Sequence, residues 1–194
     1  MKQDIILAGV GGQGILSIAT VIGSAALEHG LYIKQAEVHG MSQRGGDVQS
    51  HLRLSSEPIH SDLIPRGGAD LIVSLEPMEA LRYVPFLSPD GWIITNTVPF
   101  CNIPNYPPIE DVLAELRTFP RLIALDVDTV ARETGSPRGA NMVLLGASAG
   151  VMSILDPDKL RAGIRRIFAR KGDAVVDSNI KAFDAGLSLS SKVR

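Results

Sequence analysis

The feature that most constrains the fold is an apolar run that ends in a cluster of glycines and is followed by a helical pattern. Residues 4–10 (DIILAGV) show no polar alternation, which is typical of a strand buried on both faces of a parallel sheet. From Ile15 to Ala26, apolar residues recur every three or four positions, which predicts an amphipathic helix, and Gly30 is suited to end it. With a second strand expected at residues 31–36, this pattern indicates a βαβ unit.

Short apolar runs alternate with helical patterns along the rest of the chain. Strands are predicted at residues 48–54, 70–75, 91–95 and 122–127, and helices at residues 76–83, 109–118, 141–155, 156–170 and 173–189. A turn at residues 55–58 (SSEP) indicates that one hairpin interrupts the parallel pattern. The predicted fold class is α/β: a doubly wound, mostly parallel, Rossmann-like sheet with helices on both faces and a helical C-terminal region.

The predicted helix at residues 141–155 is apolar on every side and has a run of small residues at its centre, from Gly146 to Gly150. A helix of this kind is enclosed by protein, and small residues let a second backbone come close to it. We therefore expect another element to pack tightly against this helix.

Length and composition exclude several classes of protein. The 194 residues suit one domain over residues 1–194. A net charge of -2 gives no long-range attraction to nucleic acid or to a membrane surface. The apolar runs are shorter than the ~20 residues that span a bilayer, and no secretory signal opens the chain. We expect a cytoplasmic protein that binds neither nucleic acid nor membranes.

The chain has a single cysteine, Cys101. One cysteine excludes an internal disulfide. It also excludes an iron–sulfur cluster held by this chain alone, because such clusters need about four thiolates.

The first segment that suggests chemistry is the glycine turn itself, GVGGQG at residues 9–14, which matches the pattern GxGxxG between a strand and a helix. Glycines let backbone N–H groups approach a ligand, and the helix N-terminus adds partial positive charge, so the turn suits a phosphate or carboxylate. The alternative is that the glycines only allow the helix to pack closely on the sheet. The candidate anion-binding residues are Gly9, Gly11, Gly12, Gln13 and Gly14.

The second segment is the polar loop EVHGMSQRGG at residues 37–46, which begins where the second strand ends. Because the carboxyl ends of parallel strands meet at one edge of a sheet, we expect this loop to lie beside the glycine turn. Arg44 is suited to hold a carboxylate or phosphate, and His39 to donate a hydrogen bond or move a proton. The candidate site residues are Glu37, His39, Gly40, Met41, Ser42, Gln43, Arg44, Gly45 and Gly46.

Two other interpretations of this loop stay open. Arg44 can pair with Glu37 and simply brace the loop. Glu37 also lies 23 residues after Gly14, close to where an NAD-binding fold places the acid that holds the ribose hydroxyls, which indicates a self-sufficient NAD-dependent dehydrogenase. Against that interpretation, the residues after Glu37 would crowd the place of the adenosine.

A proline-rich stretch at residues 98–108 (VPFCNIPNYPP) is predicted to cross the surface as an extended loop. It is either a plain connector or an arm that contacts a partner. The second interpretation rests on Phe100, Ile103 and Tyr106, whose apolar side chains would otherwise be left in water.

Together, the motifs at residues 9–15 and 37–46 resemble the gamma domain of the 2-oxoacid:ferredoxin oxidoreductases, a pyruvate/ketoisovalerate oxidoreductase type of domain. Within that family the chain is most similar to the small, or beta, subunits that act with indolepyruvate. The resemblance extends to NMVLLG at residues 141–146 and NIKAFDAG at residues 179–186.

The resemblance implies a ferredoxin-dependent oxidoreductase that decarboxylates a 2-oxoacid, an aryl pyruvate such as indolepyruvate, to an acyl-CoA. Thiamine diphosphate, Mg²⁺ and iron–sulfur clusters are then expected on a large (alpha) partner subunit, with coenzyme A as co-substrate and ferredoxin as electron acceptor. This chain lacks the Gly-Asp-Gly motif of the family's thiamine sites, because Pro89 precedes Asp90 and Gly91. It is therefore expected to bind no cofactor, to hold no catalytic residue or metal, and to be inactive alone.

In such a complex the loop would face the partner's active site, where His39, Ser42 and Arg44 would help to position substrate or coenzyme A phosphates. The segment from Pro85 to Pro108 would contact the partner. A homodimer of the isolated chain and a ligand-binding module without chemistry are the remaining alternatives.

Overall fold

The computed structural model describes residues 1–40, 46–101 and 103–191. These residues form a six-stranded sheet with the strand order β2-β3-β1-β4-β5-β6. The strands are β1 (Lys2–Val10), β2 (Tyr32–His39), β3 (Asp47–Ser55), β4 (Ala69–Ser74), β5 (Leu87–Asn96) and β6 (Leu122–Leu125).

The strand directions confirm the mostly parallel sheet. β1 pairs in parallel with β4, β4 with β5 and β5 with β6, while β3 lies antiparallel between β1 and β2. The expected βαβ unit is therefore wrong in one respect, because β1 and β2 are not neighbours. The hairpin connection is the polar loop at residues 40–46 and not the turn at 55–58, since a loop this short can only return the chain antiparallel.

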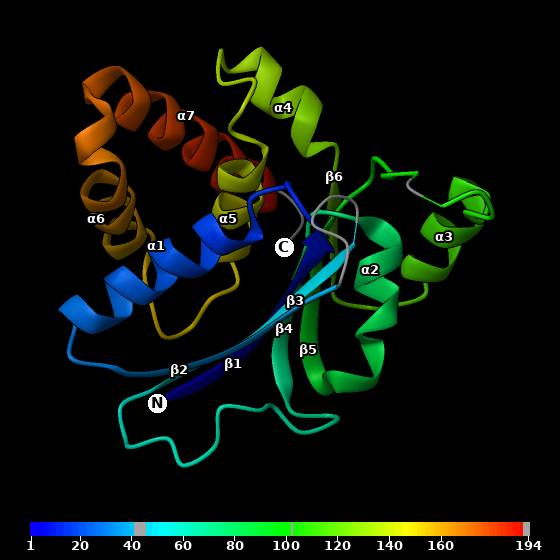
Figure 1. Cartoon of the computed structure of the whole chain (residues 1–194), viewed down its shortest axis with the longest axis horizontal. Coiled ribbons are helices and arrows are strands. Elements are labelled where there is room, and N and C mark those ends of the chain that lie inside the picture. The colour runs from blue at the N-terminus through cyan, green and yellow to red at the C-terminus, as the bar shows by residue number, and fades with distance from the viewer. Residues whose placement is uncertain (41–45, 102, 192–194) are drawn as a thin grey trace.

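Helices cover both faces of the sheet, as the doubly wound class requires (Figure 1). One face carries α1 (Ile15–Glu28), α4 (Val127–Glu133), α5 (Ala140–Ala149), α6 (Pro157–Phe168) and α7 (Asp173–Ser190). The other carries α2 (Pro77–Arg82) and α3 (Ile109–Leu116), and short 3₁₀ turns lie at Val84–Phe86 and Ala169–Lys171. In the described part of the chain, no helix combines the length and the apolar character needed to cross a bilayer.

The central strand is buried on both sides, as its unbroken apolar sequence predicts. Ile5 and Leu7 pack into the core beneath α1 and α5, whereas Ile6 and Ala8 pack into the core beneath α2 and α3. All four side chains are fully buried. Alternation of successive side chains between the two faces accounts for this arrangement.

Two predicted elements end earlier than their sequence patterns suggest. β6 stops at Leu125 because the carboxylate of Asp126 accepts the N–H of Thr129 at 2.8 Å and caps α4. The helix expected to reach residue 155 stops at Ala149, and the N–H groups of Val151 and Met152 both bond to the carbonyl of Ser148. The remaining residues lead into α6, whose first residue is Pro157.

The expected close contact on the apolar helix is made by α7. A Cβ atom added at Gly146 of α5 would overlap the carbonyl oxygen of Phe183, and one added at Gly186 of α7 would overlap the carbonyl oxygen of Val143. The two backbones therefore touch at these glycines. This pair joins the C-terminal region to the sheet, because Met142, Val143, Leu144 and Phe183 belong to the same fully buried core.

Replacing Gly146 with Ala tests this contact. Alanine usually stabilises a helix by about 1 kcal/mol relative to glycine. Here the added methyl group must push α7 away, so we expect the free energy of unfolding to fall by about 1–3 kcal/mol. Urea denaturation measures the change, with Ser188→Ala on the exposed side of α7 as the control. A Gly146→Ala protein as stable as the wild type would contradict the close approach.

Candidate functional site

The candidate site lies at the edge of the sheet where β1, β2, β4 and β5 end, together with the segments that follow them; we call it the carboxyl edge. From β1 the chain continues through α1 to β2 on one side of the sheet, and from β4 through α2 to β5 on the other. Doubly wound proteins bind ligands at this type of switch point, where adjacent parallel strands lead to opposite sides.

The glycine turn after β1 is braced by the side chain of Gln13. Its Oε1 accepts the N–H of Val10 at 2.7 Å, and its Nε2 donates to the carbonyl of Leu75 at 3.1 Å. The Gln13 N–H in turn donates to the Val10 carbonyl at 3.1 Å. Gln13 therefore ties the turn to the end of β4, which is a structural role that its motif position alone does not reveal.

Position 14 requires glycine, because of its backbone conformation and because of the nearby side chain of Asn141. Its φ of 88° lies in the left-handed region, and a Cβ atom there would come within 2.6 Å of Nδ2 of Asn141. That Nδ2 donates to the Gly14 carbonyl at 3.2 Å. Asn141 thus fixes the turn from the helical side, and sequence reasoning noted this residue only as part of a family resemblance.

A hollow of about 330 Å³ opens beside the turn, lined by Gly11, Gly12, Gly14 and Leu16 among others. α1 begins at Ile15 without a side-chain cap, so its first turn faces this region with its own N–H groups. The N–H groups of Gly11 and Gln13 are already used within the protein. Anion binding by Gly9, Gly11, Gly12, Gln13 and Gly14 stays a prediction, and it now rests mainly on Gly12, Gly14 and the start of α1.

The C-terminal end of the polar loop is bonded to the glycine turn, and its N-terminal end is paired with β3. The Gly11 N–H donates to the Gly46 carbonyl at 2.9 Å, and the Gly40 N–H donates to the Asp47 carbonyl at 2.9 Å. In the sheet register, His39 lies opposite Val48, and Val48 lies opposite Gly9. The backbone therefore brings the two predicted segments together through β3, a strand whose place in the sheet the sequence pattern did not predict.

The side chains at residues 41–45 of the polar loop are not described by the structure. Met41, Ser42, Gln43, Arg44 and Gly45 lie outside the described residues, so their predicted roles stay predictions. Of His39, only the backbone position in β2 is described.

Glu37 does not lie where an NAD-binding acid would lie. It is in β2, and β3 separates it from β1: Glu37 is opposite Ser50, which is opposite Leu7. In the dinucleotide-binding arrangement this acid follows a strand next to the glycine turn. Here Oε2 of Glu37 accepts a hydrogen bond from Nε2 of Gln35 at 3.1 Å.

Asn96 at the end of β5 is a residue that sequence reasoning missed. Only 3% of it is exposed. Its Nδ2 donates to the carbonyl of Leu75 at 3.4 Å and to Oδ2 of Asp128 at 3.0 Å, and its Oδ1 accepts the N–H groups of Val98 and Val127. One amide thus joins the ends of β4, β5 and β6. The sequence signal that could have identified Asn96 is an asparagine at the end of an apolar strand.

Glu76 is the second missed residue, and it holds the proline-rich stretch in place. It is 1% exposed, and its Oε2 accepts the N–H of Glu79 at 2.8 Å, which caps α2. Its Oε1 accepts the N–H of Phe100 at 3.3 Å and the hydroxyl of Tyr106. Burial and the hydrogen bond to this carboxylate raise the pKa of Tyr106 well above its usual value.

The proline-rich stretch is therefore tied inward at Phe100 and Tyr106, while part of its apolar surface faces water. The side chain of Tyr106 packs on the α2–α3 core, but Val98, Phe100 and Ile103 are exposed, as is Cys101. Whether this segment is a connector or an arm that contacts a partner stays a prediction, and the exposed apolar side chains favour the arm.

Within the described ranges, no three His, Cys, Asp or Glu side chains are grouped so that they would hold a metal ion. The acidic residues of the carboxyl edge instead serve as helix caps and hydrogen-bond acceptors, as Glu76 and Asp126 show.

Solved structures share this fold. The 2-oxoglutarate:ferredoxin oxidoreductase from Magnetococcus marinus, solved with 2-oxoglutarate, coenzyme A and succinyl-CoA bound, matches 100% of this chain and 32% of its own, with a TM-score of 0.77 and 23% identity. The gamma subunit of a keto/oxoacid ferredoxin oxidoreductase from Geobacter sulfurreducens matches 98% of this chain and 99% of its own, with a TM-score of 0.73 and 22% identity.

Curated relatives are similar over their whole length. The indolepyruvate oxidoreductase subunit IorB of Archaeoglobus fulgidus is 37% identical, covering 96% of this chain and 94% of the relative. The 2-oxoglutarate synthase subunit KorC of Methanothermobacter marburgensis is 31% identical, covering 97% of each. The family described as pyruvate ferredoxin/flavodoxin oxidoreductase matches residues 4–189. The resemblance seen in the two motifs is thereby confirmed, and the chain belongs to the pyruvate ferredoxin/flavodoxin oxidoreductase family.

Proposed function

We propose that this chain is the small subunit of a ferredoxin-dependent 2-oxoacid oxidoreductase that converts an aryl pyruvate, such as indolepyruvate, to an acyl-CoA in the cytoplasm. The observation that carries the proposal is the end-to-end similarity to an indolepyruvate oxidoreductase subunit, at 37% identity over 96% of the chain. Residues 1–194 act in it as one gamma-type domain.

The redox cofactors belong to a large partner subunit in this proposal. One exposed cysteine does not hold an iron–sulfur cluster, and Pro89-Asp90-Gly91 does not fit the thiamine motif that the family implies. Thiamine diphosphate, Mg²⁺ and the clusters are therefore assigned to the large (alpha) subunit, ferredoxin is the electron acceptor, and coenzyme A is the co-substrate.

The alternative of a self-sufficient NAD-dependent dehydrogenase is not supported. The inserted β3 moves Glu37 one strand away from the glycine turn, where it would be too distant to share a ribose with a pyrophosphate bound there. The family match and the curated relatives also favour an oxidoreductase subunit.

The carboxyl edge is the face we assign to the large subunit. Among the described residues, nine large apolar side chains are exposed, and five of them lie at this edge: Leu16, Val38, Val98, Phe100 and Ile103. Gathered apolar side chains on a polar protein mark an interaction surface. The polar loop lies on the same edge, so docking there would cover it, and we assign His39, Ser42 and Arg44 to positioning the 2-oxoacid or the coenzyme A phosphates.

Co-expression with the large subunit of the same organism tests the proposal. We expect the two chains to purify together and the complex to reduce ferredoxin with indolepyruvate, coenzyme A and thiamine diphosphate, whereas the isolated chain is inactive. Phenylpyruvate, pyruvate and 2-oxoglutarate, assayed in parallel, test the preference for aryl substrates. Turnover by the isolated chain with NAD, or a homodimer that never binds the large subunit, would refute the proposal.

Replacing Phe100 with Asp tests the docking face. Its side chain is 43% exposed, so we expect stability to change little, but a carboxylate buried at the interface should raise the Kd of the complex at least about tenfold. Surface plasmon resonance or analytical ultracentrifugation measures the Kd. Leu27→Asp is the matched control. Leu27 is 64% exposed and lies near the C-terminal end of α1, whereas the first turn of α1 is the end at the carboxyl edge. Equal effects of the two substitutions would rule out this face.

Replacing Arg44 with Ala tests the role of the loop. Loss of a charge-assisted contact to a phosphate or carboxylate should raise the apparent KM for coenzyme A or for the 2-oxoacid about 10- to 100-fold in the complex. Arg66→Ala, in the exposed connection between β3 and β4, is the control. Steady-state kinetics that are the same for Arg44→Ala and the wild type would remove Arg44 from the site.

A further inference from the structure

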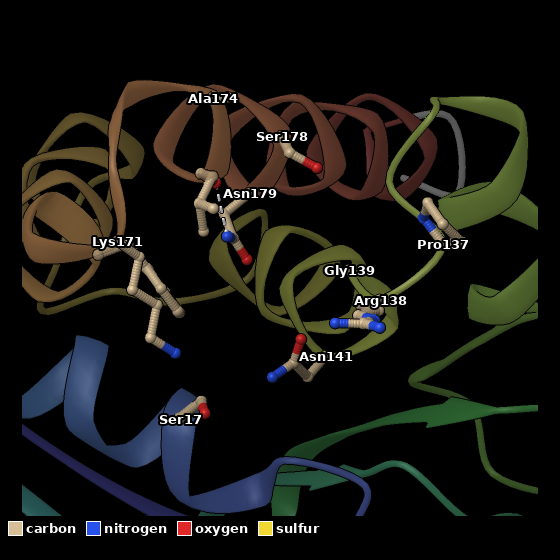
Figure 2. A pocket seen from close by; sticks show the side chains of 11 residues that line it. Ser17, Pro137, Arg138, Gly139, Asn141, Lys171, Ala174, Ser178 and Asn179 are labelled. Carbon is tan, nitrogen blue, oxygen red and sulfur yellow. Dashed lines mark hydrogen bonds between the residues drawn. The ribbon is translucent and has the colours of Figure 1, made fainter.

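A cavity of about 530 Å³ lies on the helical side of the protein. Three parts of the chain form it: the first turn of α1, the segment that leads into α5, and the segment that leads from α6 into α7 (Figure 2). Its volume is within the range of roughly 300–1,000 Å³ that is usual for small-molecule sites.

Two cationic side chains reach this cavity. Arg138 precedes α5 and Lys171 precedes α7, and Figure 2 shows both beside the same opening. No acidic residue is among the described residues that line the cavity, and neither cation forms an ion pair with any described carboxylate. The lining therefore carries two positive charges that the described protein leaves unneutralised.

The starts of two helices reach the same cavity. α5 follows Gly139 and α7 follows Gly172, and neither glycine offers a side chain to cap the first N–H groups. Gly139 and Asn141 of the α5 start, and Ala174 of the first turn of α7, line the cavity. The partial positive charge of the α5 start adds to that of Arg138 and Lys171, whereas Asp173 in the first turn of α7 offsets that of the α7 start.

One wall of the cavity is apolar. Phe168 and Val175 line it, and Nζ of Lys171 lies 5.3 Å from the centroid of the Phe168 ring. The cavity thus offers a cationic part for an anionic group and, next to it, an apolar part for the body of a small molecule.

Hydrogen bonds hold the walls in position without a ligand. Oγ of Ser136 donates to the Ser178 carbonyl at 2.7 Å, which joins the segment before α5 to α7. Nδ2 of Asn179 donates to the Val175 carbonyl at 2.7 Å, and Nδ2 of Asn141 to the Gly14 carbonyl at 3.2 Å. A preformed cavity binds a ligand with a smaller loss of conformational entropy.

We propose that this cavity is a binding site for a small phosphate monoester with a ring as its body. Two cations and the N-terminus of α5 match the double charge of a phosphate better than the single charge of a carboxylate. The ring packs on Phe168 and Val175. The cavity lies next to the glycine turn, because Ser17, which lines it, follows Leu16, and Asn141, which also lines it, holds Gly14.

Isothermal titration calorimetry of the full chain with phenyl phosphate tests the site. We expect one molecule bound per chain, and binding at least about tenfold tighter than that of inorganic phosphate, because the ring buries apolar surface. The double variant Arg138→Gln/Lys171→Gln should weaken phenyl phosphate binding by about tenfold for each cation removed. The double variant Arg66→Gln/Arg117→Gln removes the same charge from distant exposed positions and should bind as the wild type does.

Three results would overturn the proposal: no binding of phenyl phosphate to the wild type at 10 mM (about the limit of weak binding), equal loss of affinity in both double variants, or equal affinity for phenyl phosphate and inorganic phosphate. Arg138 and Lys171 are exposed, so the variants should fold, and circular dichroism verifies this. The single variants Arg138→Gln and Lys171→Gln repeat the measurement if the double variant is unstable. None of these assays needs the large subunit, so the outcome does not depend on the proposed function.

Discussion

The insertion of one antiparallel strand determines the geometry of the candidate site. β3 occupies the position next to β1 that a dinucleotide-binding fold gives to β2. Its first residue, Asp47, is opposite Val10, and the carbonyl just before it, that of Gly46, accepts the N–H of Gly11. The polar loop therefore ends at the glycine turn because it is the hairpin connection into the neighbouring strand. Moving Glu37 outward by one strand is the other consequence of the same pairing.

The carboxyl edge is held rigid by side-chain amides and carboxylates that replace missing backbone partners. The carbonyl of Leu75 accepts hydrogen bonds from Gln13 and Asn96, and the next residue, Glu76, accepts from Phe100 and Tyr106. A buried carbonyl or N–H group without a partner costs free energy. The ends of β4, β5 and β6 are covered by protein, so these side chains supply the hydrogen bonds that water would otherwise make. An edge fixed in this way keeps the exposed side chain of Phe100 in place before any partner binds, which lowers the entropy cost of docking.

Features that depend on a local sequence pattern could be predicted from the sequence, whereas features that depend on which strands pair could not. The strand, glycine turn and helix at the N-terminus, and the tight packing at Gly146, follow from apolar periodicity and residue size. The place of β3 does not, because a hairpin and a crossover can start from the same strand pattern. Asn96 and Glu76 were missed because their partners lie 21 to 32 positions away in the chain, so that no short motif marks them.

The described side chains of the carboxyl edge also indicate how catalytic work would be divided between the subunits. Burial and its hydrogen bond to Glu76 raise the pKa of Tyr106, so the phenol stays protonated at neutral pH and does not act as a base. The side chain of Glu76 accepts hydrogen bonds from Glu79, Phe100 and Tyr106, so both of its oxygens are engaged within the protein. Asn96 does not titrate. These groups are suited to fixing a surface, as the proposed assignment of the reactive cofactor to a partner subunit requires.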